Sequence, residues 1–134
     1  MGQRELIVLD THAWIWHVTE DVRLGRRARI RIRGAATLGV HPVSCWEVAM
    51  LVGSQRLRLS MDVTQWIDLA LSRPRVELLP LTASAAIRAA GLGGSFPGDP
   101  ADRFIVAAAL ELAATLVTGD TRISDWGRVQ TVWQ

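Results

Sequence analysis

The sequence predicts an α/β domain in which a small, mainly parallel sheet is covered by helices on both faces, giving three layers. Short apolar runs typical of buried strands alternate along the chain with segments whose apolar residues recur at helical spacing. The chain has 134 residues, of which 49% are hydrophobic and 21% are charged. That is enough for one hydrophobic core. No repeat, low-complexity tract or linker interrupts residues 1–134, so we expect a single domain.

The first half of the chain contains two expected strands and four expected helices. Residues 6–9 form a continuous apolar run with β-branched residues at its centre, which predicts a buried strand, and residues 37–40 predict a second one. Thr11 could cap a helix whose apolar surface runs from Ala13 to Trp16. Further helices are expected over residues 26–32, 44–52 and 61–71, with Gly34, Gly53 and Pro74 marking their ends.

The second half continues the alternation of strands and helices. Residues 76–79 predict a strand, and Thr82 is the expected cap of a helix that ends at Ala90. A glycine-rich loop then leads to Asp99-Pro100, where a helix should begin and run to about Ala114, because aspartate favours the cap and proline the first helical position. Residues 116–118 and 131–133 are the last expected strands.

Composition limits the cellular setting and leaves the partner open. Cys45 is the only cysteine, so no internal disulfide can form, which favours a reducing, cytoplasmic location. We expect no signal peptide, membrane span or membrane partner, because no apolar run is long enough. All fifteen basic residues are arginine, and six of them lie between Arg23 and Arg33. This cluster could bind nucleic acid or could be a solvated helix face.

Four acidic residues lie directly beside apolar segments: Asp10, Glu47, Asp102 and Asp120. Asp10 and Asp120 follow predicted strands, and parallel strands end at the same edge of a sheet, where ligands bind. Each acid has a structural alternative. Asp10 could cap the first helix, and Ser44-x-x-Glu47 matches a capping box. Asp99 is a natural cap, which would place Asp102 in the first turn of a helix, and Asp120 could be a turn residue. Several carboxylates at one edge would repel one another unless a cation lay between them. Together they therefore predict a shared cation site.

The ligand types favour particular ions. Oxygen-only ligands favour Mg²⁺ or Mn²⁺ over zinc, and such ions can activate water for attack on phosphorus. His12 lies near the proposed site, but a site of this kind needs no histidine base. The tryptophans at 14, 16, 46 and 66 fall within apolar helical surfaces, which favours packing in the core or between subunits over base stacking.

Four motifs resemble those of the PIN-domain ribonucleases, most closely the VapC-type toxins of bacterial toxin–antitoxin pairs. They are Leu6-Ile-Val-Leu-Asp10-Thr-His-Ala-Trp14-Ile-Trp16, Ser44-Cys-Trp-Glu47-Val-Ala, Asp99-Pro-Ala-Asp102-Arg103-Phe-Ile-Val-Ala and Leu116-Val-Thr118-Gly-Asp120. They occur in the family's order over nearly the whole chain. The resemblance implies a PIN-like α/β/α fold and a metal-dependent endoribonuclease that cleaves RNA. It also implies an antitoxin partner that covers the site, and commonly a homodimer.

The resemblance also assigns roles to single residues. It implies that Asp10, Glu47, Asp102 and Asp120 are catalytic and hold Mg²⁺ or Mn²⁺, possibly with Asp99. Thr11, Thr118 and Arg103 match positions that orient the acids or contact RNA. His41 departs from the pattern, because a serine is often found there, and Gly53-Ser-Gln-Arg56-Leu departs from a common lysine-containing turn. These departures concern RNA contacts and leave the acids intact.

The expected function is therefore that of a toxin with endoribonuclease activity. The alternative is a non-catalytic RNA-binding or antitoxin-complex subunit whose acids hold a structural metal ion. The RNA target, the cleavage position, the antitoxin and the number of metal ions do not follow from the sequence.

Overall fold

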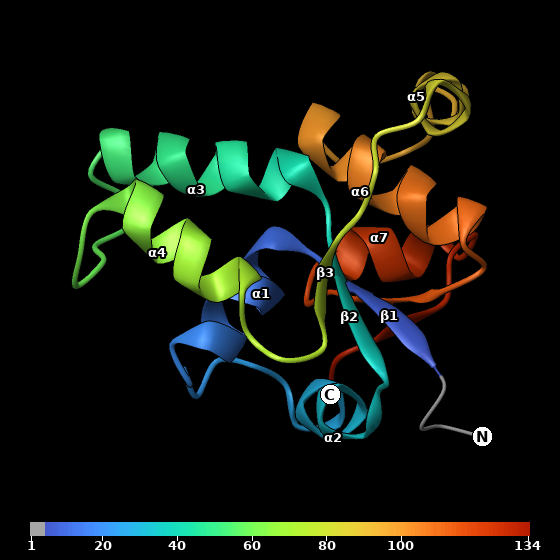
Figure 1. Cartoon of the computed structure of the whole chain (residues 1–134). Coiled ribbons are helices and arrows are strands. Elements are labelled where there is room, and N and C mark those ends of the chain that lie inside the picture. The colour runs from blue at the N-terminus through green and yellow to red at the C-terminus, as the bar shows by residue number, and fades with distance from the viewer. Residues whose placement is uncertain (1–4) are drawn as a thin grey trace.

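A computed structural model describes residues 5–134, and its centre is a five-stranded, wholly parallel sheet (Figure 1). The strand order is β3-β2-β1-β4-β5. The strands are β1 (Leu6–Leu9), β2 (Thr37–Val40), β3 (Val76–Leu78), β4 (Thr115–Val117) and β5 (Thr131–Val132). The predicted α/β class with a small parallel sheet is confirmed, and the two strands expected in the first half have the predicted bounds.

Seven helices surround the sheet in the described part of the chain. They are α1 (Thr11–Val18), α2 (Arg26–Gly34), α3 (Pro42–Gly53), α4 (Val63–Leu71), α5 (Ala83–Ala90), α6 (Pro100–Glu111) and α7 (Thr121–Trp126). None of them is long and apolar enough to cross a membrane.

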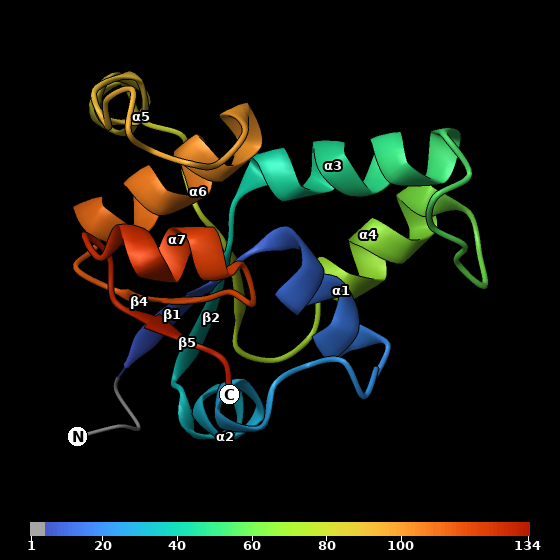
Figure 2. The ribbon, with the colours of Figure 1, turned by 180° about the vertical axis from the view of Figure 1, so that it is seen from behind.

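The helices form a layer on each face of the sheet. Ile7 and Leu9 of β1 pack with α1, α2, α3 and α4, whereas Val8 between them packs with α6 and α7. This alternation follows from strand geometry, because successive side chains point to opposite faces. Figure 2 shows α5, α6 and α7 together on one side of the sheet and α1 with α4 on the other. The core therefore has two parts, separated by the sheet.

The order in which strands are added to the sheet reverses at β1, although all strands stay parallel. From β1 it proceeds to β2 and β3 on one side, and β4 then pairs with the other side of β1, with Leu9 opposite Val117. The connection after β1 enters α1 on one face, and the connection after β4 enters α7 on the other. Such a switch point leaves a crevice at the carboxyl ends of the two strands.

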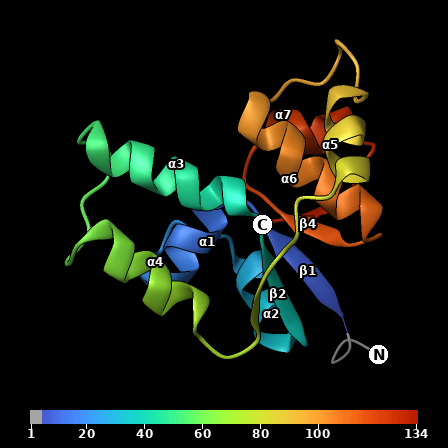
Figure 3. The same cartoon turned by 45° about the horizontal axis from the view of Figure 1, so that its top comes forward.

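Helix α3 bridges the two layers. It contacts α1 and α4 on one side and α6 on the other. In Figure 3, α3 and α4 extend together to one side of the sheet, and the first turns of α3 lie next to α6. The N-terminal parts of α3 and α6 thus lie at the edge where β1 and β4 end.

Several predicted element boundaries differ from the structure. Helix α3 begins at Pro42, two residues before the predicted start, and α4 begins at Val63 with Asp62 as its cap. Helix α6 ends at Glu111, short of Ala114, because Ala113 adopts a left-handed backbone conformation with φ of 51°. Helix α7 was not predicted.

Candidate active site

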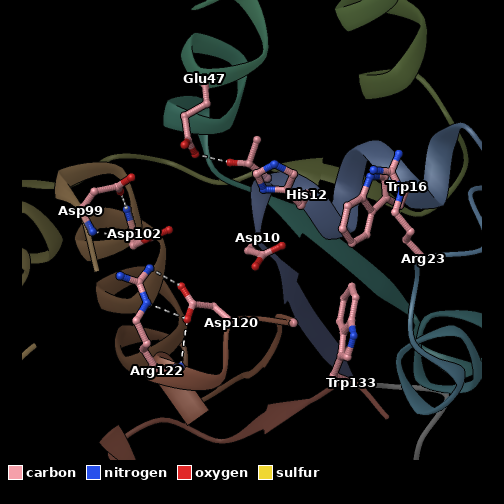
Figure 4. A pocket seen from close by; sticks show the side chains of 12 residues that line it. Asp10, His12, Trp16, Arg23, Glu47, Asp99, Asp102, Asp120, Arg122 and Trp133 are labelled. Atoms are coloured by element: carbon pink, nitrogen blue, oxygen red, sulfur yellow. Dashed lines mark hydrogen bonds and ion pairs between the residues drawn. The ribbon is translucent and has the colours of Figure 1, made fainter. Parts of the chain in front are cut away.

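A cavity of about 640 Å³ opens at the carboxyl ends of β1 and β4, and five carboxylates line it (Figure 4). Each of the four predicted acids comes from a different element: Asp10 from the end of β1, Glu47 from α3, Asp102 from α6 and Asp120 from the start of α7. The full lining consists of Asp10, Thr11, His12, Trp16, Arg23, Glu47, Asp99, Asp102, Gly119, Asp120, Arg122 and Trp133. We call it the acidic cavity.

Asp10 directly follows β1 and is the N-cap of α1. Its carboxylate accepts a hydrogen bond from the backbone N–H of Ala13 (2.8 Å), so Asp10 caps α1. The expectation that Thr11 caps this helix was therefore wrong, and Thr11 is its first residue. Burial raises the pKa of Asp10, while hydrogen bonds from Thr118 and Ala13 partly oppose the rise.

Glu47 faces the cavity from the first half of α3 and has no capping role. His41 caps this helix, because its Nδ1 accepts from the N–H of Val43 (2.9 Å). The capping-box interpretation of Ser44 and Glu47 was thus wrong. Thr11 instead donates a short hydrogen bond to the Glu47 carboxylate, and its hydroxyl also lies 2.9 Å from that of Ser44. Burial raises the pKa of Glu47.

Asp99 and Asp102 form a reciprocal capping box at the start of α6. Asp99 accepts from the N–H of Asp102 (3.0 Å), and Asp102 accepts from the N–H of Asp99 (3.3 Å). The expected cap at Asp99 is therefore confirmed, and its carboxylate still borders the cavity. Burial, and then the charge of Asp99, raises the pKa of Asp102 to about 7.

Asp120 differs from the other acids because a cation already pairs with it. Arg122 contacts the Asp120 carboxylate through Nη2 (2.8 Å) and Nε (3.1 Å), which lowers the pKa of Asp120. Asp120 also caps α7. Thr118 lies just before it, and its hydroxyl accepts from the N–H of Asp120 (3.1 Å). Both predicted threonines are thus hydrogen-bonded to predicted acids: Thr11 to the Glu47 carboxylate, and Thr118 to the Asp10 carboxylate and the Asp120 backbone.

Arg103 does not line the acidic cavity. Its guanidinium donates to the carbonyls of Ala89 (3.2 Å) and Gly93 (2.8 Å) and lies over the ring of Phe96. In this structure Arg103 anchors the loop between α5 and α6, and its contact with RNA stays a prediction. Arg23 and Arg122 are the arginines that border the cavity.

The donor set of the cavity fits a hard divalent cation. The acids offer carboxylate oxygens, which Mg²⁺ and Mn²⁺ prefer. Burial is the largest cause that raises the pKa of Asp10, Glu47 and Asp102, and neighbouring carboxylates add to it. Among residues 5–134, however, no three acidic, histidine or cysteine side chains are grouped tightly enough to hold one ion. Glu47 is bonded to Thr11 and Asp120 to Arg122, so carboxylates would have to turn inward to share an ion.

Aromatic residues occupy the side of the cavity opposite most of the acids, and sequence reasoning missed this. Figure 4 shows His12, Trp16 and Trp133 on one side and Asp99, Asp102 and Asp120 on the other, with Asp10 between them. The expected packing role holds for Trp14 and Trp66, which are buried in edge-to-face contact. Trp16 instead borders the cavity. The sequence did contain a signal for this position: Trp16 lies four residues after His12, so both side chains share the helical face next to Asp10.

The model of the PIN domain family matches residues 7–129, which is most of the chain. The chain belongs to the PIN domain family. It is also 37% identical over 129 residues to Ribonuclease VapC22 of Mycobacterium tuberculosis strain ATCC 25618 / H37Rv, covering 95% of this chain and 98% of that protein. The predicted resemblance is therefore confirmed.

Solved structures share the PIN fold at low sequence identity. The VapBC2 complex of Rickettsia felis, bound to a DNA fragment from its promoter, contains a chain with a TM-score of 0.70 and 16% identity, covering 96% of this chain and 99% of that one. A toxin–antitoxin complex from Klebsiella pneumoniae gives a TM-score of 0.67 and 20% identity, covering 94% and 95%. These likenesses confirm the predicted α/β/α fold.

Proposed function

We propose that this PIN domain protein is a metal-dependent endoribonuclease and the toxin of a toxin–antitoxin pair. The observation that carries the proposal is the convergence of five carboxylates, supplied by β1, α3, α6 and α7, on one cavity at the switch point of the sheet. A relative named as a ribonuclease, similar over nearly its whole length, supports the substrate class.

In this proposal Asp10, Glu47, Asp102 and Asp120 hold Mg²⁺ or Mn²⁺, and Asp99 either joins them or only caps α6. A bound ion would stabilise negative charge on the scissile phosphate and lower the pKa of a water molecule.

The chain's own residues prepare the site in three ways. Thr11 orients the Glu47 carboxylate by donating to it. Thr118 binds Asp10 and fixes the backbone before Asp120. Arg122 pairs with Asp120 in the absence of an ion. Because the arginine side chain is largely exposed, the pair is weak and can give way when Asp120 binds a cation.

The partners follow from the same proposal. The chain acts on RNA as a single domain in the cytoplasm, a cognate antitoxin covers the acidic cavity, and two copies form a homodimer. Solved structures that share its fold are VapBC and other toxin–antitoxin complexes, which supports an antitoxin partner. Co-expression with the product of a neighbouring gene tests for the antitoxin, and light scattering coupled to size-exclusion chromatography tests for the dimer.

Cleavage of single-stranded RNA tests the activity. The purified protein should cleave RNA in Mg²⁺ or Mn²⁺ and lose the activity in excess EDTA. Asp10→Asn should lower the rate at least about 100-fold, because it removes a charge that the ion requires. Asp125→Asn is the matched control, since this exposed acid of α7 lies outside the cavity. If Asp10→Asn cleaves RNA as fast as the wild type, the acids are not catalytic and a structural metal site remains.

A further inference from the structure

The aromatic side of the acidic cavity is built from two distant parts of the chain. His12 and Trp16 come from α1 and Trp133 follows β5, and we call these three residues the aromatic wall. The ring centroids of His12 and Trp16 are 5.5 Å apart, and those of Trp16 and Trp133 are 5.9 Å apart. The wall is therefore a continuous aromatic surface on the cavity.

Trp133 is held in place on several sides. Its carbonyl accepts a hydrogen bond from the N–H of Ala28 in α2 (3.0 Å). Its ring covers Gly119, where an added Cβ would lie 2.7 Å from the ring, and a Cβ at Gly25 would lie 2.1 Å from its carbonyl oxygen. Two glycines thus give Trp133 the room to approach the cavity next to Asp120.

The wall lies at the margin of one part of the core. Trp16 and Trp133 pack against that part but are only partly buried, and His12 is exposed. The guanidinium of Arg23 lies 4.8 Å from the centroid of the Trp16 ring, so a charged, exposed group already stacks on it. An accessible aromatic surface beside a group of carboxylates suits a ligand that has a flat aromatic group and, next to it, an anionic group that can share a cation with the carboxylates.

We propose that the aromatic wall of His12, Trp16 and Trp133 is a stacking subsite for an unpaired base of the RNA substrate, adjacent to the phosphate that the acids process. This inference rests on the proposed ribonuclease function. Base stacking on aromatic side chains tolerates any base and requires an unstacked one, so the subsite selects single-stranded RNA. Arg23 lies at the rim of the wall, where its guanidinium is paired with Asp21 (2.8 Å). To contact the phosphate of the stacked nucleotide, it would exchange that carboxylate for a phosphate.

The geometry limits how the base can bind. The planes of Trp16 and Trp133 are tilted by 53° and their rings already touch, so no base fits between them. The base must stack on the ring faces that border the cavity. Stacking also solves an electrostatic problem, because the five carboxylates repel a polyanion and the aromatic contact attracts it independently of charge.

Binding in excess EDTA tests the subsite without any cleavage. Fluorescence anisotropy compares two probes of equal length, oligoadenylate and a fully abasic oligomer with the same number of phosphates. The wild type should bind oligoadenylate about tenfold more tightly than the abasic oligomer, which is a typical stacking contribution. Trp133→Leu and Trp16→Leu should each reduce that preference several-fold, and Trp133→Phe should retain part of it.

The matched control is Trp46→Leu, since Trp46 is exposed on α3 and lies outside the cavity lining. Its binding should equal that of the wild type. The loss caused by Trp133→Leu should stay constant as salt is varied, because only phosphate contacts release counterions.

Three outcomes would overturn the proposal, and they separate it from the function on which it rests. Equal affinity of the wild type for both probes, or an oligoadenylate affinity unchanged in both leucine variants, refutes stacking even if RNA is cleaved in Mg²⁺. A wild type that neither binds nor cleaves RNA refutes the ribonuclease function as well. The first comparison uses the wild type alone, so it stands even if Trp133→Leu does not fold.

Discussion

The pair between Asp120 and Arg122 places a positive charge at a carboxylate that would have to turn toward a bound ion. Arg122 contributes two hydrogen bonds, and its side chain is 63% exposed, so the pair adds little to stability. Its effect on the cavity is larger, because a bound cation must compete with the guanidinium for the same two oxygens.

Arg122→Gln should therefore strengthen Mn²⁺ binding by about three- to tenfold, since it frees Asp120 and removes a repulsive charge. Isothermal titration calorimetry with Mn²⁺ measures the change. Arg88→Gln is the control, because Arg88 pairs with Glu111 at 3.6 Å outside the cavity. Unchanged or weaker Mn²⁺ binding by Arg122→Gln would contradict the competition.

Asp102 makes the stability of the metal-free protein depend on pH. Its folded pKa is about 7, above the ordinary value of 3.8. Between these two pH values the folded state keeps a proton that the unfolded state has lost, so the free energy of unfolding falls as pH rises from about 4 to 7 and then levels off. Burial of Asp10 and Glu47 acts in the same direction.

Asp102→Asn should remove part of this decline. In EDTA, we compare the free energy of unfolding of the variant with that of the wild type at two pH values. From pH 4.5 to pH 8, this difference should shift in favour of the variant by on the order of 2 kcal/mol, a value already reduced for solvent screening. Urea unfolding at several pH values measures it. Parallel pH curves for the two proteins would show that Asp102 titrates normally.

At the scale of the elements, the end of α6 carries a local strain. Ala113 has a φ of 51°, a conformation that glycine adopts without cost, while the N–H of Ala114 bonds to the carbonyl of Ala109 (2.9 Å). Ala113→Gly should stabilise the protein by roughly 0.5–1 kcal/mol.

Thermal and urea unfolding measure that gain. The matched control is Ala114→Gly at the next position, which is not among the residues with positive φ and should lose stability. A loss of stability in both variants would show that the left-handed conformation carries no strain.

The sequence predicted most elements because their signals are local. The strands of the first half and the capping of α5 by Thr82 and of α6 by Asp99 follow from apolar runs and cap residues. Helix α3 was misplaced because His41 acts as the cap, and a histidine ring is an uncommon acceptor in that position. Helix α7 has only six residues and one buried apolar side chain, too few to show periodicity.

The candidate site was predictable only in part. Strand ends brought Asp10 and Asp120 to one edge, and the motifs added Glu47 and Asp102. The anchoring of Arg103 to the loop before α6, and the approach of Trp133 to Trp16 across 117 positions, depend on tertiary contacts that no local pattern encodes.

At the scale of the whole molecule, the four acids come from both helical layers and from the sheet between them. Glu47 belongs to α3, Asp102 and Asp120 to helices on the opposite face or their caps, and Asp10 to the central strand. A cation bound by all four would link these elements and offset the burial and the repulsion that raise the pKa of Asp102.

Mn²⁺ should therefore raise the melting temperature at pH 8, and the rise should grow with ion concentration, because an ion that binds only the folded state stabilises it by mass action. At an ion concentration about 100 times the Kd the gain is about 2.7 kcal/mol. Differential scanning fluorimetry of the wild type and Asp10→Asn measures it. An equal rise in the variant would place the ion elsewhere.

The position of β4 has a consequence for how the protein is made. β4 is the partner that completes the sheet on the far side of β1, and it carries Thr118 and Asp120 at its end. A nascent chain that has not yet produced residue 115 therefore lacks one wall of the acidic cavity, however well its earlier helices have folded. For the proposed nuclease, activity cannot precede the synthesis and pairing of β4, so the ribosome making the protein is not exposed to a working enzyme before that strand has folded against β1.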